Sequence, residues 1–318
     1  MAIISQETTL AVAYLQNDVV AIPTETVYGL AANALRADLV ARIFEVKARP
    51  TFDPLIVHTC SLEQVERLVT SFPAPLKALA KAFWPGPLTL LLPKSNVIPD
   101  IVTSGLNRVG IRMPDHAITL KLIEQCGFPL AAPSANPFGY ISPTKPEHVQ
   151  AQLGEKIPMI LDGGPCKVGI ESTIVGIENG KHAIYRLGGI APEAIMEHVG
   201  EVDFYLTAGS NPGAPGMLLA HYAPRKPLFI EGQTDDKKLL SHEKTFFIQF
   251  EKLREDISAD AQYILSPQGN IQQAAIQLFE ALHQAEQHAG SEQIIAQKVP
   301  AVGLGPAIND RLQRAAYK

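Results

Sequence analysis

Basic side chains that stand among apolar residues are the part of this sequence best suited to chemistry. Lys47 and Arg49 follow an apolar stretch with helical spacing, Arg112 lies in the run VGIRM, and Arg186 lies in IYRL. A buried arginine is rare unless it pairs with a carboxylate or contacts an anion. Lys47 alone could simply complete a helix C-terminus. Together, the four cations predict a cationic pocket whose natural guest is an anion such as a nucleotide phosphate.

Polar segments that follow apolar runs are the second feature with chemical potential. PTETVYGL at 23–30 and PSAN at 133–136 each follow a predicted strand, Ser142 extends the second segment, and His58 ends the run PLIVH. Binding groups gather in loops at strand ends. Turn residues that bond to nearby backbone explain the same pattern about equally well. Both interpretations therefore stay open for these segments taken singly.

The segment GIESTIV at 169–175 alternates in the manner of a strand. This alternation would put Ile170, Ser172 and Ile174 on one face. A serine between apolar residues on a core face needs a hydrogen-bond partner. Ser172 is therefore predicted to be buried beside another polar group.

Hydrophobic periodicity predicts the elements that would position these groups. In the first 206 residues, strands are predicted at 18–22, 54–59, 88–92, 109–113, 128–132, 159–162, 172–177 and 183–187. Helices are predicted at 38–47, 62–69, 74–83, 116–126 and 191–199. Since strands and helices do not alternate strictly, the pattern predicts an α/β or α+β fold with a twisted, mixed sheet.

A break in composition at 207–227 divides the chain. This stretch holds three glycines and four prolines, which favour neither helix nor sheet pairing and predict a long semi-rigid linker. It separates a first domain at 1–206 from a second at 228–318. In the second domain, strands are predicted at 227–231, 245–250, 261–265 and 293–298, with an amphipathic helix at 271–287 and a last helix after Gly305. This alternation predicts a small parallel α/β domain of the Rossmann-like type.

Composition excludes several classes of function. The 318 residues carry a net charge of −5, which argues against a surface devoted to bulk nucleic-acid binding. Cys60, Cys126 and Cys166 are far apart and predict neither a disulfide framework nor a zinc finger, and a reducing cytoplasm fits them. No apolar run reaches 18 residues, so no membrane span is expected. The motifs GxxxxGK[ST] and HExxH are missing and the histidines are scattered, so no protein-bound metal is predicted.

In combination these segments are far more specific than they are singly. The pairs Lys47-x-Arg49 and Ser134-x-Asn136, with PTETVYGL, PLIVH and GIESTIV, resemble the YrdC-like domain of threonylcarbamoyl-AMP synthases. The linker APGMLLAHYAP and the segment GLGPAINDRLQRAA resemble the two-domain branch of that family. The resemblance implies the family's α/β fold with a concave, positively charged cleft.

The resemblance also implies a reaction. L-threonine, bicarbonate and ATP, accompanied by Mg²⁺, would give L-threonylcarbamoyl-AMP and pyrophosphate. A separate transferase complex would then pass the threonylcarbamoyl group to adenosine in the anticodon loop of tRNAs that read ANN codons. The chain would then be a cytoplasmic nucleotidyltransferase that needs no stable tRNA binding of its own.

Roles for individual residues follow from the same resemblance. Threonine would be held by Thr26, His58, Arg112, Ala132 and Ser172. ATP would be held by Lys47, Arg49, Ser134, Asn136, Ser142 and Arg186, with Lys47 and Arg49 as the catalytic cations. His221 and Tyr222 would close over the cleft as part of a lid formed by the linker.

Two positions depart from the family pattern. Asp53 stands where many members carry asparagine, and an acid there would repel phosphate unless it faced Mg²⁺ or an adenosine hydroxyl. Arg108 stands where threonine is common and adds a cation that could reach phosphate. Asp53 and Arg108 are both predicted to contact ATP.

Two alternatives use the same cleft differently. An RNA-binding module would show salt-sensitive affinity that needs no ATP, but the net charge of −5 and the lack of an aromatic stacking platform weigh against it. The carbamoyl-transfer chemistry of hydrogenase maturation uses a similar domain in longer chains with cysteine-rich zinc fingers, and no CxxC occurs in this sequence.

Overall fold

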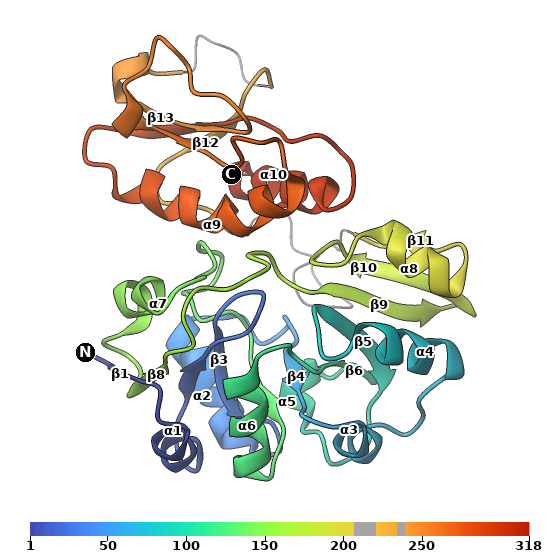
Figure 1. Ribbon diagram of the computed structural model, residues 1–318. Helices are drawn as coiled ribbons and strands as arrows, with labels where there is room; N and C mark the ends of the chain where they lie inside the picture. The colour runs from blue at the N-terminus through green and yellow to red at the C-terminus, as the bar shows by residue number, and fades with distance from the viewer. Residues whose placement is uncertain (207–220, 234–238, 318) are drawn as a thin grey trace.

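A computed structural model describes residues 1–206, 221–233 and 239–317. Two sheets organise the chain (Figure 1), a large one built from β1 to β11 and a small one built from β12 to β15. The predicted linker at 207–227 lies within the described residues only from His221 onward.

The large sheet is mixed, as the sequence predicted. Its strands lie in the order β1-β8-β2-β3-β7-β4-β6-β5-β9-β10-β11. They are β1 (Ile3–Ser5), β2 (Val20–Ile22), β3 (Gly29–Asn33), β4 (Ile56–His58), β5 (Leu88–Pro93), β6 (Arg108–Arg112), β7 (Leu130–Ala131), β8 (Met159–Leu161), β9 (Thr173–Glu178), β10 (Lys181–Arg186) and β11 (Asp203–Phe204). Parallel pairs such as β4–β6 and β5–β9 alternate with antiparallel pairs such as β5–β6 and β9–β10.

Helices cover both faces of the large sheet. They are α1 (Thr8–Leu15), α2 (Ala37–Lys47), α3 (Leu62–Leu68), α4 (Ala74–Phe83), α5 (Asp100–Thr103), α6 (Ala117–Cys126), α7 (Pro146–Leu153) and α8 (Pro192–Val199). The neighbouring helices α1 and α6 bury their apolar residues against β2, β3 and β8, in a cluster separate from the main core. Helices α2, α3, α4 and α7 contribute to that main core. Because helices pack on both faces of the sheet, the strand ends are held in fixed positions. The polar residues predicted to form the site lie at these strand ends.

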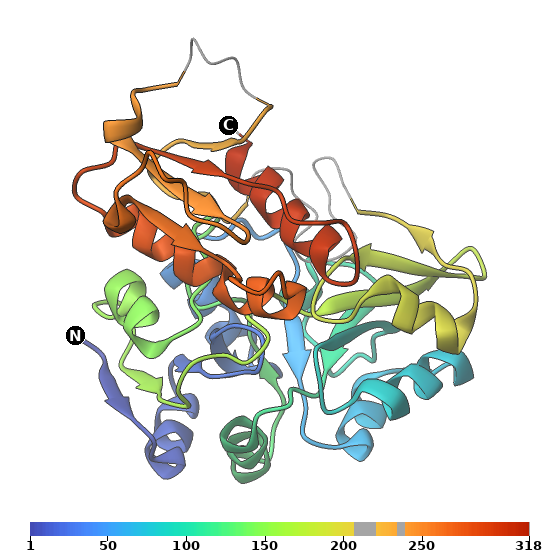
Figure 2. The ribbon, with the colours of Figure 1, turned by 45° about the horizontal axis from the view of Figure 1, so that its top comes forward.

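The small sheet is wholly parallel, in the order β12-β15-β13-β14. The part of the chain that forms this sheet and its helices contains β12 (Leu228–Ile230), the 3₁₀ helix η2 (His242–Lys244), β13 (Thr245–Gln249), the 3₁₀ helix η3 (Ala259–Ala261), β14 (Gln262–Ile264), α9 (Ile271–Gln287), β15 (Gln293–Ala296) and α10 (Gly305–Ala316). Helices α9 and α10 pack together on this sheet and face the large sheet (Figures 1 and 2). None of the described helices is long and apolar enough to cross a bilayer.

A glycine allows α9 to approach the large sheet closely. Gly169 has φ +78°, and a Cβ there would lie 2.4 Å from the Cα of Ile276 in α9. Any other residue would therefore meet both backbone strain and a steric clash with the helix. This position fixes the small sheet domain close to the segment that contains Ser172.

The sequence predictions succeeded where periodicity was strong. All five helices predicted before residue 206 are present, as are the strands and helices predicted after residue 227. Periodicity missed β1, β3, α1, α5, α7 and β11, which are short or lack a clear pattern. The strand predicted at 172–177 begins at Thr173, so the strand-like alternation predicted to include Ile170 and Ser172 was wrong.

Candidate functional site

A pocket lies where loops and strand ends of the large sheet meet the segment after residue 220. Strands β4 and β6 run parallel and in register, so His58 and Arg112 at their ends are neighbours on the same face. The polar segment before β3 supplies Thr24 and Thr26, and β10 ends at Arg186. The pocket is lined by Thr24, Thr26, Val27, Gly29, Arg49, Pro54, Ile56, His58, Arg112, Ala132, Pro133, Ser134, Glu171, Ser172, Arg186, His221 and Tyr222.

Arg112 is held in a fixed orientation by partners from two loops. Its Nη2 lies 2.6 Å from a carboxylate oxygen of Glu25, and Nη1 donates to Thr26 Oγ1 at 2.9 Å. Its Nε donates to the carbonyl of Gly86 at 3.3 Å. Since Arg112 and Glu25 are both almost fully buried, neither charge is screened by water. The guanidinium is therefore preorganised for a planar anion at the pocket.

His58 is a neutral donor or acceptor beside this cation. Burial lowers its pKa to about 3, and the charge of Arg112 reinforces the shift. Its Nδ1 is buried and has no hydrogen-bond partner among the residues that the structure describes. A buried polar atom at a pocket wall is available to a ligand, because leaving it unpaired is unfavourable.

Arg49 forms the second cationic wall. It pairs with Asp53 at 2.9 Å and donates from Nε and Nη2 to the carbonyls of Asp53 and Pro54. Its guanidinium also lies 5.8 Å from the ring centre of Phe138. Burial raises the pKa of Asp53, while the positive charge of Arg49 opposes that shift. Asp53 is fully buried behind Arg49 and does not line the pocket, so its contacts indicate that it orients Arg49.

Arg186 and Ser172 form the third wall. Arg186 donates from Nε to the carbonyl of Ser172 and from Nη2 to its hydroxyl, both at 2.9 Å. The Ser172 hydroxyl also lies 2.7 Å from that of Thr89. The prediction that Ser172 is buried beside polar partners is confirmed, although it precedes the strand.

The segment after residue 220 covers one side of the pocket. Tyr222 is buried, adopts a positive φ of 64°, and packs its ring against Phe279 of α9 with centroids 5.5 Å apart. His221 packs edge-on against Tyr222, and its pKa is lowered well below the usual value by burial and by nearby cations including Arg49. Both residues therefore form part of the pocket wall and are not exposed to solvent.

Family models match almost the whole chain. The Sua5–YciO–YrdC model, described as telomere recombination, matches residues 13–188. The model described as the C-terminal domain of threonylcarbamoyl-AMP synthase matches residues 190–317. The threonylcarbamoyl-AMP synthase of Pyrococcus abyssi is 41% identical over 310 residues, covering 95% of this chain and 91% of its own length. The Bacillus subtilis enzyme of the same name is 42% identical over 312 residues, covering 95% and 90%.

The chain belongs to the two-domain threonylcarbamoyl-AMP synthase family. A crystal structure of the Pyrococcus abyssi family member Sua5, complexed with L-threonine, superimposes with a TM-score of 0.90 and 38% identity. That superposition covers 99% of this chain and 97% of the other. Full-length HypF, at 22% identity and a TM-score of 0.51, shares the fold over 58% of this chain.

The structure brings most of the predicted site residues of this family member to one pocket. Those that line it are Thr26, Arg49, His58, Arg112, Ala132, Ser134, Ser172, Arg186, His221 and Tyr222. Lys47, Asn136 and Ser142 are buried immediately behind the wall. Lys47 donates from Nζ to the carbonyls of Ser134 and Asn136, which fixes the loop that follows β7. Burial and the neighbouring charge of Arg49 lower the pKa of Lys47 well below its usual value.

Arg108 does not reach the pocket. It begins β6 and Arg112 ends it, so their Cα atoms are about 13 Å apart along an extended strand. Arg108 pairs instead with Glu178 at 2.8 Å, donates to the hydroxyl of Tyr185, and lies over that ring. The geometry gives the predicted contact between Arg108 and ATP no support.

Sequence reasoning assigned no role to two carboxylates and one arginine at this site. Glu25 and Glu171 are buried partners of Arg112 and Arg311, and Ser142 donates to Glu171 at 2.7 Å. The neighbouring motifs contained both acids, so a search for partners of the buried arginines could have found them. Arg311 lies on α10, 140 residues after Glu171, and no local pattern pointed to its contact with this site.

Proposed function

We propose that this chain synthesises L-threonylcarbamoyl-AMP and pyrophosphate from L-threonine, bicarbonate and ATP. The product would pass to a tRNA threonylcarbamoyl transferase complex that modifies adenosine in tRNAs reading ANN codons. The observation that carries the proposal is the convergence of Arg49, Arg112 and Arg186 on one pocket with the small polar groups of Thr26 and Ser172. Membership of the family supports the same activity.

The reaction needs charge stabilisation and positioning more than a side-chain nucleophile. The amine of threonine adds to CO₂ derived from bicarbonate and loses a proton, giving a carbamate. A carbamate oxygen then attacks the α-phosphorus of ATP, and the bond to the bridging oxygen breaks as pyrophosphate leaves. Negative charge on the transferred phosphoryl group and on pyrophosphate would be stabilised by fixed cations. Holding three substrates in one pocket supplies much of the remaining rate enhancement.

Threonine would lie at the strand ends of β4 and β6. The Arg112 guanidinium, oriented by Glu25 and Thr26, suits the planar α-carboxylate. His58, neutral at physiological pH, offers its unpaired Nδ1, while Thr26, Ser172 and the backbone of Ala132 complete the wall. The Pyrococcus abyssi structure with bound L-threonine supports this ligand. A missing methyl group is worth about 1–3 kcal/mol, so we expect some serine to be used.

ATP would lie between the other two arginines. Arg49 and Arg186 would face phosphate oxygens, with Ser134 at the loop after β7. Lys47, Asn136 and Ser142 are better suited to hold that loop and Glu171 in place from behind. Lys47 would therefore act on ATP through the loop, whereas Arg49 would act directly.

Magnesium would enter as part of the nucleotide substrate. The three carboxylates nearest the pocket, Glu25, Asp53 and Glu171, are each bound to an arginine. Within the described residues, no three His, Cys, Asp or Glu side chains gather as a metal-ligand set. Oxygen ligands for Mg²⁺ would thus come mainly from the phosphates and water, as is usual for this ion.

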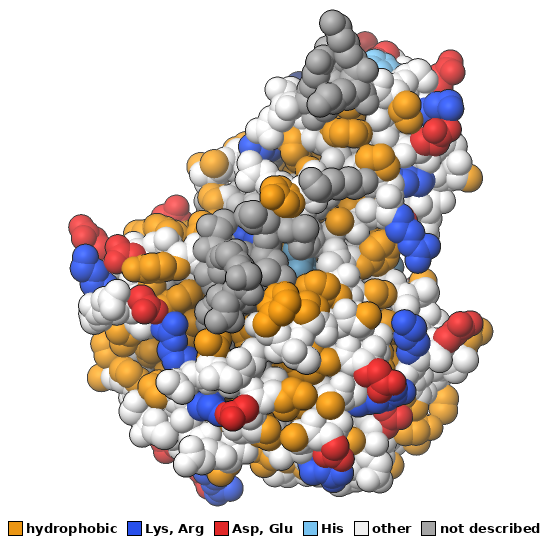
Figure 3. All heavy atoms as spheres, turned by 180° about the vertical axis from the view of Figure 1, so that it is seen from behind, with side chains coloured by type: hydrophobic (Ala, Val, Ile, Leu, Met, Phe, Trp, Pro, Cys, Tyr) orange, Lys and Arg blue, Asp and Glu red, His pale blue; other side chains and the backbone are white. Residues whose placement is uncertain are grey.

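The remaining expectations concern organisation. We propose domains at 1–206 and 228–318, the second Rossmann-like, with 207–227 acting as a lid that carries His221 and Tyr222. The cytoplasm would be the site of action. Over the described part of the face in Figure 3, basic and acidic side chains are interspersed, which supports an enzyme without stable tRNA binding.

Pyrophosphate release by the purified protein tests this proposal. ATP, threonine and bicarbonate are supplied together, and threonine and bicarbonate are then omitted in turn. Release that needs both supports carbamate-dependent adenylation. Release with neither would indicate an unrelated ATPase, and salt-sensitive RNA binding without release would favour the RNA-binding alternative.

A further inference from the structure

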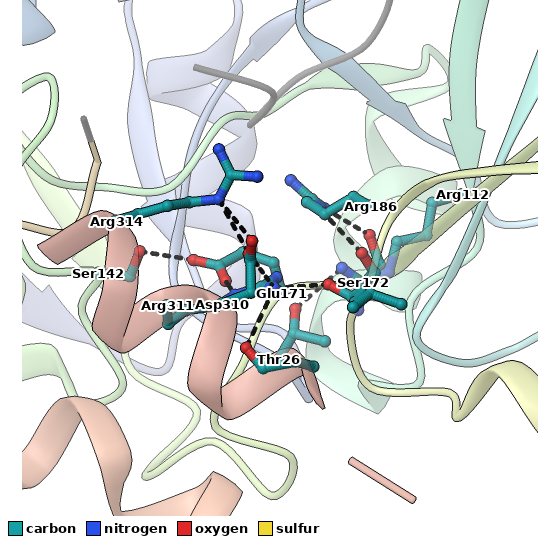
Figure 4. A network of polar contacts seen from close by, with 11 residues as sticks. Thr26, Arg112, Ser142, Glu171, Ser172, Arg186, Asp310, Arg311 and Arg314 are labelled. Atoms are coloured by element: carbon teal, nitrogen blue, oxygen red, sulfur yellow. Dashed lines mark hydrogen bonds and ion pairs between the residues drawn. The ribbon is translucent and has the colours of Figure 1, made fainter. Parts of the chain in front are cut away.

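Every carboxylate at the pocket is bound to an arginine, but one of these arginines comes from the other sheet domain. Glu25 pairs with Arg112 and Asp53 pairs with Arg49, all from the large sheet domain. Glu171, which lines the pocket, pairs at 3.1 Å with Nε of Arg311 on α10. In Figure 4, side chains of α10 approach Glu171 from one side, and Ser172 and Arg186 lie on the other.

Arg311 is firmly anchored for this contact. Its side chain is fully buried, and Nη1 donates to the carbonyl of Leu187 at 2.6 Å. Its guanidinium also lies 5.5 Å from the ring centre of Tyr222. Burial opposes the charge, but Tyr222 and the carboxylates of Glu171 and Asp310 raise the net pKa of Arg311. The residue therefore stays charged and holds Glu171 in place.

Arg186 is the pocket arginine with no carboxylate at ion-pair distance among the residues that the structure describes. Its guanidinium donates instead to the neutral carbonyl and hydroxyl of Ser172. Glu171 precedes Ser172 in the chain, lines the same pocket and interacts electrostatically with Arg186, so its carboxylate is a competitor for Arg186. A carboxylate bound to Arg186 would cancel the positive charge that ATP requires.

We propose that Arg311 is a positioning residue that binds Glu171 and so keeps Arg186 available to the phosphates of ATP. The inference rests on the proposed function, because it takes ATP as the anion. It gives the C-terminal domain a role in nucleotide binding although none of the residues that the structure describes in that domain lines the pocket. Removal of Arg311 would leave a buried carboxylate without its partner, beside a cation that could replace it.

The decisive experiment measures ATP affinity by calorimetry, without threonine, in R311M, R311K and R311M/E171Q. R311M should bind ATP at least tenfold more weakly than the wild type, because Glu171 then competes for Arg186. R311M/E171Q should recover to within about threefold of wild type, since a neutral amide cannot cancel Arg186. R311K, which keeps the charge near Glu171, should also bind within about threefold. Threonine affinity, set by Arg112, should change little in all three.

A matched control comes from the same interface. Lys145 forms an ion pair with Glu280 of α9 at 2.7 Å and contacts none of the pocket residues through it. K145M should bind ATP like the wild type. An equal loss of affinity in K145M and R311M would show that seating of the C-terminal domain matters in general, and would overturn the specific role of Arg311.

Other outcomes separate this inference from the proposed function. Unchanged ATP affinity in R311M, or a folded R311M/E171Q that remains tenfold weaker than wild type, would overturn the inference. The double variant keeps the test valid if R311M alone fails to fold, because it contains no unpaired buried charge at this pair. A wild type that binds ATP but releases no pyrophosphate would contradict the proposed function, while the affinity ratios would still test the role of Arg311.

Discussion

The pocket of the large sheet and the surface of the small sheet both contain ion pairs between basic and acidic side chains, but these pairs differ in their exposure to water. In the Arg49–Asp53 pair the side chains are 5% and 1% exposed, whereas in Lys244–Glu292 they are 53% and 59% exposed. Water screens the second pair, and such pairs contribute little to stability. Removing one partner of a buried pair costs about 3–5 kcal/mol because a charge is left unpaired. We therefore expect both function and stability to depend on the pocket pairs far more than on the surface pairs.

The largest effect is expected for Arg112. In R112M, kcat/KM for threonine-dependent pyrophosphate release should fall at least about 100-fold. The α-carboxylate of threonine would lose the guanidinium that binds it, and Glu25 would lose its ion-pair partner. Steady-state kinetics with threonine varied would measure this loss. R108M is the matched control, since Arg108 lies on the same strand but outside the pocket. A similar loss in R108M would restore the predicted contact between Arg108 and ATP.

A smaller effect is expected when Asp53 is replaced. In D53N, the KM for ATP should rise about three- to tenfold, because Arg49 keeps a neutral partner but loses a charge-assisted contact. The Mg²⁺ concentration that gives half-maximal rate should not change, since Asp53 faces Arg49. Titration of Mg²⁺ in both proteins would check this, and a large shift in the Mg²⁺ requirement would instead make Asp53 a metal contact.

Buried histidines should make stability depend on pH. Burial lowers the pKa of both His58 and His283 to about 3, against about 6.5 in an unfolded chain. The unfolded state therefore binds more protons between these values, and stability should fall as pH drops below 6.5 and stay level above it. Protonation of each of these histidines in the unfolded state would lower the free energy of unfolding by about 2 kcal/mol between pH 6.5 and 5. Denaturant unfolding at several pH values would measure how steeply the free energy of unfolding changes with pH. Below pH 6.5, this slope should correspond to about one proton fewer in H283Q than in the wild type. Equal slopes would contradict a contribution of His283 to the pH dependence.

The smallest effect is expected at the surface of the small sheet. K244M removes an exposed ion pair with Glu292, and neither kcat/KM nor the melting temperature should change measurably. Thermal unfolding and pyrophosphate release measured side by side would test this. A clear loss of activity would remove the contrast between the two regions.

The buried cations were the part of the site that the sequence predicted best. Arg49, Arg112 and Arg186 stand in apolar surroundings, and such cations are conspicuous because burial is unfavourable without partners. The sequence could not predict which of these residues line the pocket and which lie behind its wall. Lys47 and Asn136 belong to the same motifs as Arg49 and Ser134 but lie behind the pocket wall, because the loop after β7 turns back on the end of α2.

Long-range partners were beyond prediction for a physical reason. On an amphipathic helix such as α10, a charged residue is usually assigned to the solvent side. Arg311 instead lies at the boundary of two sheets, where only the tertiary fold brings Glu171 to it. Arg108 illustrates the converse, because it shares a strand with Arg112 but lies at the opposite end.

The 140-residue separation between Glu171 and Arg311 has a consequence for biosynthesis. A ribosome adds about 5–20 residues per second, so about 7–28 s pass between the appearance of the acid and that of its partner. During this interval, the nascent large sheet domain contains an acid whose final partner has not been made. Nucleotide binding would then mature only after α10 has emerged and docked, which would make incomplete chains poor competitors for ATP.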